Sequence, residues 1–320
     1  MAEYTVLDRQ QLTEVLAHFG LAPPSQVKPE PKGAVNTGYH VWSGGHRYFL
    51  RVTEGRVEAD VRFEAEAQAY LHAAHFPVPA LQASLDGRHW THVAGKPAML
   101  FAYAPGEELL SAAITADRCR RLGEQMGRLH ELAAGFAHSR PNPFGRGWVG
   151  ERLAEIVAAP PADAEAVAAL PLLEGELDAA ARLPGAPAGL VHGDLLVDNV
   201  LWIGDRVSAV LDWEMSCTEP FAYDLGVALN AWCWAGGYQT DRALALWAGY
   251  RGRRKIEPET AEALYEWSRF AALRFAVARL RGYVPAGAAP TPGKDWREYR
   301  DRLSELRAMG EPAFRKLLGI

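Results

Sequence analysis

The first third of the chain contains short apolar runs that are rich in β-branched and aromatic residues and are broken by glycine pairs and prolines, a pattern that predicts β-strands. Gly44 and Gly45 separate the first two runs and can adopt the positive φ angles of a tight hairpin turn. Between residues 63 and 74, apolar residues instead recur at helical spacing, which predicts one helix among the strands. The strand-like runs cover residues 39–42, 46–53, 88–93 and 97–103.

Downstream of residues 104–106 the apolar positions recur mainly at the spacing of a helix. Thr115 is placed to cap a helix through 119–133, and Gly135 is placed to end it. Apolar residues at helical spacing over 264–278 predict a long helix later in the chain. We therefore expect helices to dominate this part.

The change of pattern predicts a division of the chain into two regions. We expect a hinge at about residues 101–106, between a strand-rich region over 1–104 and a mainly helical region over 105–320. Pro-rich stretches near 160–161 and at 285–292 predict loops within the helical region.

Polar residues gather around a second predicted hairpin, whose turn is Gly204-Asp205. In such a hairpin Asn199 pairs with Val210, and Asp212 lies diagonally opposite Asn199 on the same face, about 7–8 Å away. An amide oxygen and a carboxylate at this separation can hold one or two Mg²⁺ ions together with substrate phosphates. The spacing therefore predicts a site for a metal-bound nucleotide.

Asp194 precedes Asn199 by a few residues, and its carboxylate can accept the proton of a hydroxyl that attacks a γ-phosphate. Asp and Asn also cap helices and form Asx-turns in loops, but an apolar strand before this segment and a hairpin after it favour the chemical interpretation. We expect His192 to shape the loop through backbone contacts rather than act as a base. Asp198 either binds substrate or caps the local turn.

Composition and charge exclude several classes of protein. In 320 residues, 34 Lys and Arg against 39 Asp and Glu give a net charge of −5, which disfavours nucleic-acid and anionic-membrane partners. The three cysteines have no metal-type spacing, and the amino terminus lacks the pattern of a signal peptide. No apolar run approaches the length of a membrane span. We therefore expect a cytoplasmic protein with no targeting segment.

One set of motifs comprises His192-Gly193-Asp194-Leu195, Asn199, Asp212 and Tyr223-Asp224-Leu225. Together these motifs resemble the aminoglycoside phosphotransferase-like branch of the kinase superfamily, and the match spans nearly the whole chain. A second set of stretches lies at residues 194–201, 223–233, 249–251, 271–275 and 279–280, and at Lys294-Asp295 with Glu298-Tyr299. In this second set the sequence is most similar, within that branch, to the type II homoserine kinases.

The resemblance implies an α+β, two-lobed, protein-kinase-like fold. Its N-terminal lobe, residues 1–104, would be a small antiparallel sheet with one helix and would bind the nucleotide. Its larger, mainly helical C-terminal lobe, residues 105–320, would hold the catalytic residues and the substrate. The predicted hinge falls where this family places the crossing between its lobes.

The resemblance also implies roles for the polar residues of the second hairpin and its surroundings. Asp194 would be the catalytic base, and Asn199 and Asp212 would ligate the Mg²⁺ ions that bridge the phosphates of ATP. Asp224 would brace the catalytic loop by accepting backbone N–H groups; the alternative is an ordinary charge in the first turn of a helix. His192 would support the same loop.

In the N-terminal lobe, residues 33–39 resemble the turn that positions the nucleotide, which makes Asn36 and Thr37 candidate ATP-binding residues. Arg51 stands where kinases usually keep a lysine for the α- and β-phosphates. Its ion-pair partner would be Glu64 or Glu66 of the following helix, and Glu64 fits better by spacing. The alternative for Arg51 is a surface arginine on a strand. The backbones of two further residues would bind adenine, Ala102 and Ala104.

The favoured acceptor is L-homoserine, whose carboxylate and ammonium require a cation and a polar or anionic group beside the base. Arg274 and Arg279 lie among apolar residues and are candidate substrate ligands, together with Asp198. Arginines argue against a polycationic aminoglycoside, which would favour an acidic site. The alternatives are a kinase of another small hydroxylated metabolite or antibiotic, and an inactive kinase fold that serves as a binding module. The sequence leaves the oligomeric state open.

Overall fold

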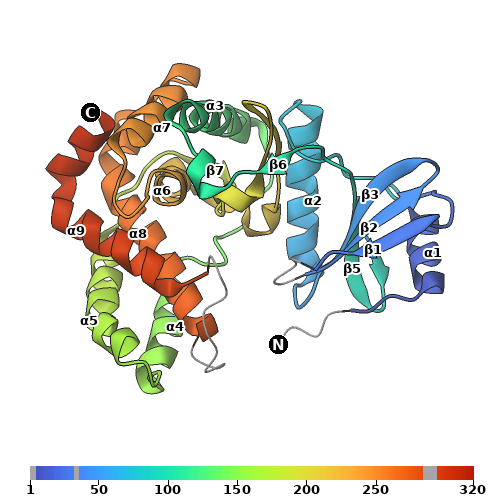
Figure 1. Cartoon of the computed structure of the whole chain (residues 1–320), viewed down its shortest axis with the longest axis horizontal. Helices are drawn as coiled ribbons and strands as arrows, with labels where there is room; N and C mark the ends of the chain where they lie inside the picture. Colours follow the sequence, from blue (N-terminus) through green and yellow to red (C-terminus); the bar gives the residue numbers. More distant parts are fainter. Residues whose placement is uncertain (1–4, 32–35, 284–293) are drawn as a thin grey trace. The chain divides into compact units, whose positions relative to one another are not determined.

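The computed structural model describes residues 5–31, 36–283 and 294–320. Its chain forms two compact units, each with its own core, and Figure 1 shows their helices and strands. The first unit comprises Met1–Glu107 with Val200–Glu214, and the second unit comprises Glu108–Asn199 with Met215–Ile320.

The first unit is built on an antiparallel sheet of five strands in the order β1-β2-β3-β5-β4. The predicted turn is present between Ser43 and His46, with Gly44 at φ 57° and Gly45 at φ 80°. These positive angles are the ones that a two-residue hairpin turn requires. The strands are β1 (Gln26–Pro29), β2 (Thr37–Ser43), β3 (His46–Val52), β4 (Thr91–Val93) and β5 (Lys96–Ala102).

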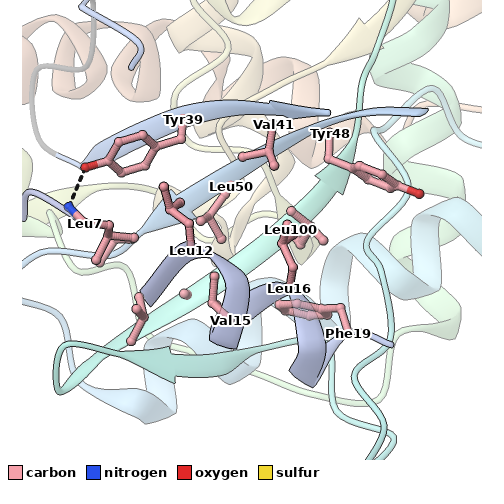
Figure 2. Packing of buried hydrophobic residues seen from close by; sticks show 13 residues of the cluster. Leu7, Leu12, Val15, Leu16, Phe19, Tyr39, Val41, Tyr48, Leu50 and Leu100 are labelled. Carbon is pink, nitrogen blue, oxygen red and sulfur yellow. Dashed lines mark hydrogen bonds between the residues drawn. The ribbon is translucent and has the colours of Figure 1, made fainter. Parts of the chain in front are cut away.

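The sheet carries a helix on each face. The predicted helix is α2 (Glu58–Ala73), and it packs against Met99 and Phe101. The opposite face packs against α1 (Arg9–His18), a short helix that the sequence pattern did not reveal (Figures 1 and 2). The core on the α1 side contains Leu12, Val15, Leu16, Tyr39, Val41, Tyr48, Leu50, Val52 and Leu100.

Alternation along β3 sorts its side chains between these two faces. Tyr48, Leu50 and Val52 belong to the core beneath α1, where the Tyr39 hydroxyl of β2 accepts the Leu7 N–H at 2.9 Å (Figure 2). Because successive strand residues point to opposite faces, Arg51 points to the face that α2 covers. The strand pattern thereby brings Arg51 to the helix that carries its predicted partner.

The second hairpin is also present, with β8 (Val200–Ile203) and β9 (Arg206–Val210) joined through Gly204-Asp205. The register differs from the predicted one, because Val200 rather than Asn199 pairs with Val210. A bulge between Leu201 and Trp202 leaves an extra residue in β9, which shifts every pair beyond it by one position. Asn199 instead ends the short 3₁₀ turn Val197–Asn199, so the predicted diagonal pairing with Asp212 was wrong.

Helices make up most of the second unit, together with the two-stranded sheet of β7 (Ala188–Val191) and β10 (Cys217–Pro220). Thr115 caps the predicted helix by accepting the Arg118 N–H, and that helix ends at Leu132 before a 3₁₀ turn through Gly135. The predicted loop at 285–292 lies outside the described residues. The helices are α3 (Ala116–Leu132), α4 (Arg146–Ala158), α5 (Ala164–Ala179), α6 (Phe221–Trp232), α7 (Thr240–Arg253), α8 (Pro258–Tyr283) and α9 (Trp296–Leu318).

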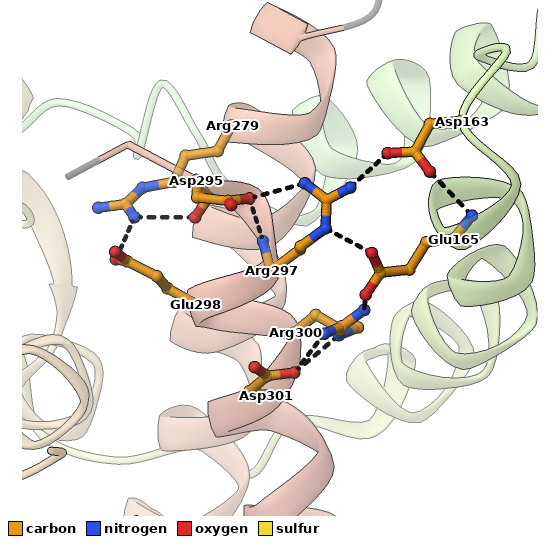
Figure 3. Close-up of polar contacts among 8 residues, drawn as sticks. All are labelled: Asp163, Glu165, Arg279, Asp295, Arg297, Glu298, Arg300 and Asp301. Atoms are coloured by element: carbon orange, nitrogen blue, oxygen red, sulfur yellow. Dashed lines mark hydrogen bonds and ion pairs between the residues drawn. The ribbon is translucent and has the colours of Figure 1, made fainter. Parts of the chain in front are cut away.

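Two helix contacts of this unit position functional residues. Helices α3 and α7 cross closely at Gly123 and Gly249. A Cβ atom at either glycine would collide with a backbone carbonyl oxygen of the other helix, so the absence of a side chain permits this approach. Helix α9 is tied to α5 by an ion-pair network in which Arg297 binds both Asp163 and Glu165 (Figure 3). The first contact places His130 and Tyr250, and the second fixes the helix that carries Glu298 and Tyr299.

Candidate active site

The loop that carries Asp194 leaves β7 and is held by a buried carboxylate. Asp224, in the first turn of α6, accepts the backbone N–H of His192 at 3.2 Å and that of Gly193 at 2.8 Å. Its side chain is fully buried, so it is not an ordinary exposed charge at a helix start. This is the bracing geometry that the resemblance implied for Asp224.

His130 of α3 completes the support of Asp224. Its Nε2 lies 3.2 Å from the carboxylate, and its Nδ1 lies 2.9 Å from the Tyr250 hydroxyl. Burial lowers the pKa of His130 and outweighs the opposite effect of Asp224. A neutral ring then donates from Nε2 to Asp224 and accepts from Tyr250 at Nδ1, which fixes the tautomer.

Within the loop, His192 and Asn199 fix the position of Asp194. The ring Nδ1 of His192 accepts the Asp194 N–H at 3.2 Å, which is the architectural contact expected of this histidine. Asn199 donates from Nδ2 to the Asp194 carbonyl at 2.8 Å and to its Oδ2 at 3.3 Å. Because the amide nitrogen faces these acceptors, the amide oxygen of Asn199 is the atom that can coordinate a cation.

Gly193 permits the sharp turn before Asp194. Its φ is 74°, and a Cβ there would lie 2.8 Å from the Met215 carbonyl oxygen. We expect Gly193→Ala to lower the free energy of unfolding by about 2 kcal/mol or more, and to lower activity by displacing Asp194, because strain and a clash with backbone add together. Denaturant unfolding and steady-state kinetics measure the two effects.

The matched control is Gly236→Ala in the same unit. Gly236 has nearly the same φ of 72°, but nothing lies within 4 Å of the added methyl group. We expect this variant to lose only about 1 kcal/mol from backbone strain and to keep its activity. Equal losses in the two variants would show that the contact with Met215 does not matter.

In the first unit, a buried ion-pair cluster surrounds Glu64 of α2. Arg51 donates to its Oε1 at 2.6 Å, so the predicted pair is present, and Arg51 is too deeply buried to be a surface arginine. Arg56 donates to the other oxygen, Oε2, at 2.8 Å. Burial alone would raise the pKa of Glu64, but the two arginines outweigh it and hold that pKa below its usual value.

The cluster predicts a pH dependence of stability. The folded-state pKa of Glu64 lies below its unfolded value of about 4.5, so its stabilisation is complete above that value and is lost as the pH falls through the folded-state pKa. At pH 7 we expect Glu64→Gln to lower the free energy of unfolding by about 3 kcal/mol, because the buried Arg51 and the partly buried Arg56 both lose the carboxylate that they share. The difference in the free energy of unfolding between Glu64→Gln and wild type should become smaller as the pH falls below about 4.5.

Urea unfolding of both proteins across this pH range measures the difference. The control is Glu66→Gln on the same helix, for which we expect a change within about 0.5 kcal/mol at pH 7. If the loss of unfolding free energy in Glu64→Gln did not vary with pH, the proposal that Glu64 is ionised beside Arg51 and Arg56 would be contradicted.

Asp212 follows β9 and lies near the same cluster. Its Oδ1 is 3.9 Å from Arg51 Nη1, its side chain is 41% exposed, and its φ is 57°, in the left-handed region. An accessible carboxylate oxygen here and the amide oxygen of Asn199 are hard donors of the type that Mg²⁺ prefers. The residues predicted to hold the metal therefore fit it by their chemistry.

The other predicted nucleotide residues have partners within the first unit. Asn36 donates to Glu214 Oε2 at 2.7 Å and accepts the Glu54 N–H, while Thr37 donates to Glu54 Oε1 at 2.8 Å. The preceding residues 33–35 of the predicted nucleotide turn lie outside the described residues. At the end of β5, the Ala102 N–H donates to the Ala80 carbonyl.

The Ala102 carbonyl and the Ala104 N–H are the backbone groups that stay candidates for adenine. Neither group takes part in the hydrogen bond between the Ala102 N–H and the Ala80 carbonyl. The role of Ala102 and Ala104 stays a prediction, as do those of Asn36 and Thr37.

The candidate substrate residues lie in the second unit, and they differ from one another. Asp198 is exposed in the 3₁₀ turn before Asn199. Arg274 of α8 is 4% exposed and donates from Nη1 to Asp194 Oδ1 at 3.2 Å. Arg279 donates instead to Glu298 at 2.8 Å and to the Asp295 carbonyl at 3.1 Å (Figure 3). Only Arg274 of the two arginines is brought to the predicted base.

Sequence reasoning missed three residues that complete these clusters. The sequence places His130 within the predicted helix 119–133, and no local pattern shows that it contacts Asp224. Arg56 and Glu214 were not predicted as site residues either. Arg56 donates to the Glu214 carbonyl at 3.0 Å and also donates to Glu64. The available signal for Arg56 was a basic residue seven residues before the predicted helix, which begins at residue 63.

No group of three or more His, Cys, Asp or Glu side chains that could hold a metal is found in the parts of the chain that the structure describes. No helix within those same parts is long and apolar enough to cross a membrane.

Comparison with known proteins agrees with the fold and its motifs. The family model described as the phosphotransferase enzyme family matches residues 26–258. The homoserine kinase of Methylorubrum populi is 34% identical over 322 residues, covering 97% of this chain and 98% of the relative. The homoserine kinase of Azorhizobium caulinodans is 33% identical over 317 residues, with 97% of both chains covered.

A solved structure shows the same fold. An amicoumacin kinase in complex with AMP-PNP, Ca²⁺ and Ami matches with a TM-score of 0.71 at 16% identity, covering 95% of this chain and 93% of that chain. The predicted kinase-like fold, with its antiparallel sheet and mainly helical C-terminal part, is therefore confirmed. The chain belongs to the phosphotransferase enzyme family.

Proposed function

We propose that the protein is an ATP-dependent homoserine kinase, which transfers the γ-phosphoryl group of ATP to the hydroxyl of L-homoserine. The product is O-phospho-L-homoserine, on the route to threonine. The observation that carries this proposal is a braced loop that holds Asp194 between Asn199 and a buried arginine, Arg274, in a chain related over nearly its full length to homoserine kinases. A base beside a cation suits an acceptor that has both a hydroxyl and a carboxylate.

Asp194 is the residue that acts on the acceptor. It accepts the hydroxyl proton as the oxygen bonds to the γ-phosphorus and the bond from that phosphorus to the β-phosphate oxygen breaks, so that ADP leaves. Asn199 holds its backbone and its carboxylate, and His192 and Asp224 hold the loop around it. Asp198, exposed in the same loop, is left to contact the acceptor or to cap its own turn.

ATP is the phosphoryl donor, as the phosphotransferase family implies. Asn199 and Asp212 would hold Mg²⁺, which neutralises the charge that develops on the phosphates. Arg51, oriented by Glu64, would face the phosphates. Backbone groups of Ala102 and Ala104 would bind adenine, and Asn36 and Thr37 would position the nucleotide.

The protein is proposed to act in the cytoplasm. Cys119, Cys217 and Cys233 are all buried free thiols, a state that suits a reducing compartment. Its partner is a small hydroxylated molecule.

A screen of ATP consumption tests the proposed acceptor. The purified chain is incubated with Mg-ATP and, in turn, L-homoserine, choline, methylthioribose and several aminoglycosides. We expect one strong response, with L-homoserine. A stronger response with any other acceptor would favour a different small-molecule kinase, and no response with any of them would favour an inactive binding module.

A further inference from the structure

The surroundings of Arg274 point to a function beyond its contact with Asp194. The side chain is 4% exposed, and its guanidinium carbon lies 4.0 Å from the ring centre of Phe275 and 4.7 Å from that of Phe144. Such contacts with aromatic faces fix the plane of a guanidinium. Arg274 is therefore a rigid, buried cation at the side of the predicted base.

Its hydrogen-bonding capacity is only partly used. Nη1 donates to Asp194 Oδ1 at 3.2 Å, whereas the buried Nε has no hydrogen-bond partner among the described residues. A buried donor without a partner is costly, and a ligand that accepts a hydrogen bond from it removes that cost. An arginine presents its Nε edge as a fork that matches a carboxylate in a bidentate manner.

Neighbouring arginines do not offer this edge in the same way. Arg279 is already engaged with Glu298 and with the Asp295 carbonyl, as Figure 3 shows. Arg269 forms two hydrogen bonds with Glu176, at 2.8 and 2.9 Å. Arg274 is thus the arginine of α8 that combines a contact with the base and an unused buried donor.

We propose that Arg274 is the residue that selects acceptors bearing a carboxylate. It binds that carboxylate through its Nε edge while Nη1 holds Asp194, so one rigid group fixes both the base and the far end of the acceptor. The inference rests on the proposed function, since it explains why an amino acid rather than a simple amino alcohol is phosphorylated. The hydroxyl of an acceptor without a carboxylate is not held against Asp194.

The test compares acceptors that differ in a single group. Wild type and Arg274→Gln are each assayed with three acceptors. These are L-homoserine, 3-amino-1-propanol (aminopropanol below), which lacks the carboxylate of homoserine, and γ-hydroxybutyrate, which lacks its amine. We expect wild type to prefer L-homoserine over aminopropanol by about 10³-fold in kcat/KM or more. In Arg274→Gln both acceptors lose the contact that holds Asp194, but only L-homoserine also loses the contact with its carboxylate. We therefore expect kcat/KM for L-homoserine to fall by about 10²- to 10³-fold more than kcat/KM for aminopropanol, and we expect this additional loss mainly in KM.

The loss of activity with each acceptor distinguishes a residue that selects the acceptor carboxylate from one that only supports Asp194. A residue that only positioned the base would lower kcat for both acceptors alike, and that outcome would overturn the proposal. The control is Arg281→Gln, which removes an exposed arginine of the same helix that lies 3.5 Å from Glu155, and it should leave all acceptors unchanged. Loss of discrimination in Arg279→Gln instead would also overturn it.

A measurement on wild type alone covers the case in which Arg274→Gln fails to fold. α-Aminobutyrate and propylamine, which lack the hydroxyl, are compared as inhibitors that compete with L-homoserine. We expect α-aminobutyrate to bind about 10²-fold more tightly; equal inhibition would refute a carboxylate subsite. If wild type does not phosphorylate L-homoserine at all, the proposed function fails; if it does and the discrimination survives in Arg274→Gln, only this inference fails.

Discussion

Asp194→Asn is expected to lower kcat by about 10³-fold while leaving nucleotide affinity within about twofold. The amide keeps the shape of the carboxylate but cannot accept the hydroxyl proton. Its oxygen can still accept from Arg274, and the bond from Asn199 to the backbone carbonyl of residue 194 at 2.8 Å does not depend on the side chain. The loop should therefore keep its structure, and the loss should be chemical.

Steady-state kinetics and a nucleotide titration measure the two quantities on the same preparation. A kcat close to that of wild type would exclude Asp194 as the base. A parallel loss of nucleotide affinity would show instead that the substitution disturbs the site as a whole.

Asp212→Asn is expected to weaken the affinity for Mg-ATP by about 10²-fold or more, because a ligand charge is lost. Asparagine is the suitable replacement, since the φ of 57° at this position is tolerated by Asn better than by most residues. The affinity for ATP without Mg²⁺ should change little. Calorimetric titration with ATP, in the presence of Mg²⁺ and then of EDTA, measures the difference.

The control for this variant is Asp205→Asn, at the exposed turn of the same hairpin. It removes the same charge from the same structural element and should leave Mg-ATP affinity within about twofold. An unchanged affinity in Asp212→Asn would place the metal on other residues.

Much of the fold follows from local patterns. The hairpin at Gly44-Gly45, the helix Glu58–Ala73 and the capped helix after Thr115 were predictable because turn chemistry, helical spacing and capping are properties of neighbouring residues. Helix α1 was not, since its buried residues, Leu12, Val15 and Leu16, make too short a run to be distinguished.

The register of the second hairpin shows a limit of such reasoning. Counting outward from a two-residue turn assumes a regular ladder, and the bulge near Trp202 breaks that assumption without a sequence signal such as glycine. The conclusion that Asn199 and Asp212 are oxygen donors does not depend on the register, but their predicted diagonal pairing did.

The candidate site was predictable where a motif carries the chemistry. Asp194, Asn199 and Asp224 belong to one segment, and the Arg51–Glu64 pair follows from alternation on a strand and spacing on a helix. Contacts between distant elements were not predictable. The approach of His130 to Asp224 depends on how α3 and α6 pack, and the approach of Arg274 to Asp194 depends on the path of α8.

The products of a single reaction test the central claim most directly. Wild-type protein is incubated with Mg-ATP and L-homoserine, and ADP and O-phosphohomoserine are quantified together by phosphorus NMR. We predict equal amounts of the two products, and neither above background with Asp194→Asn. Formation of ADP without O-phosphohomoserine, or undiminished product from Asp194→Asn, would contradict the account.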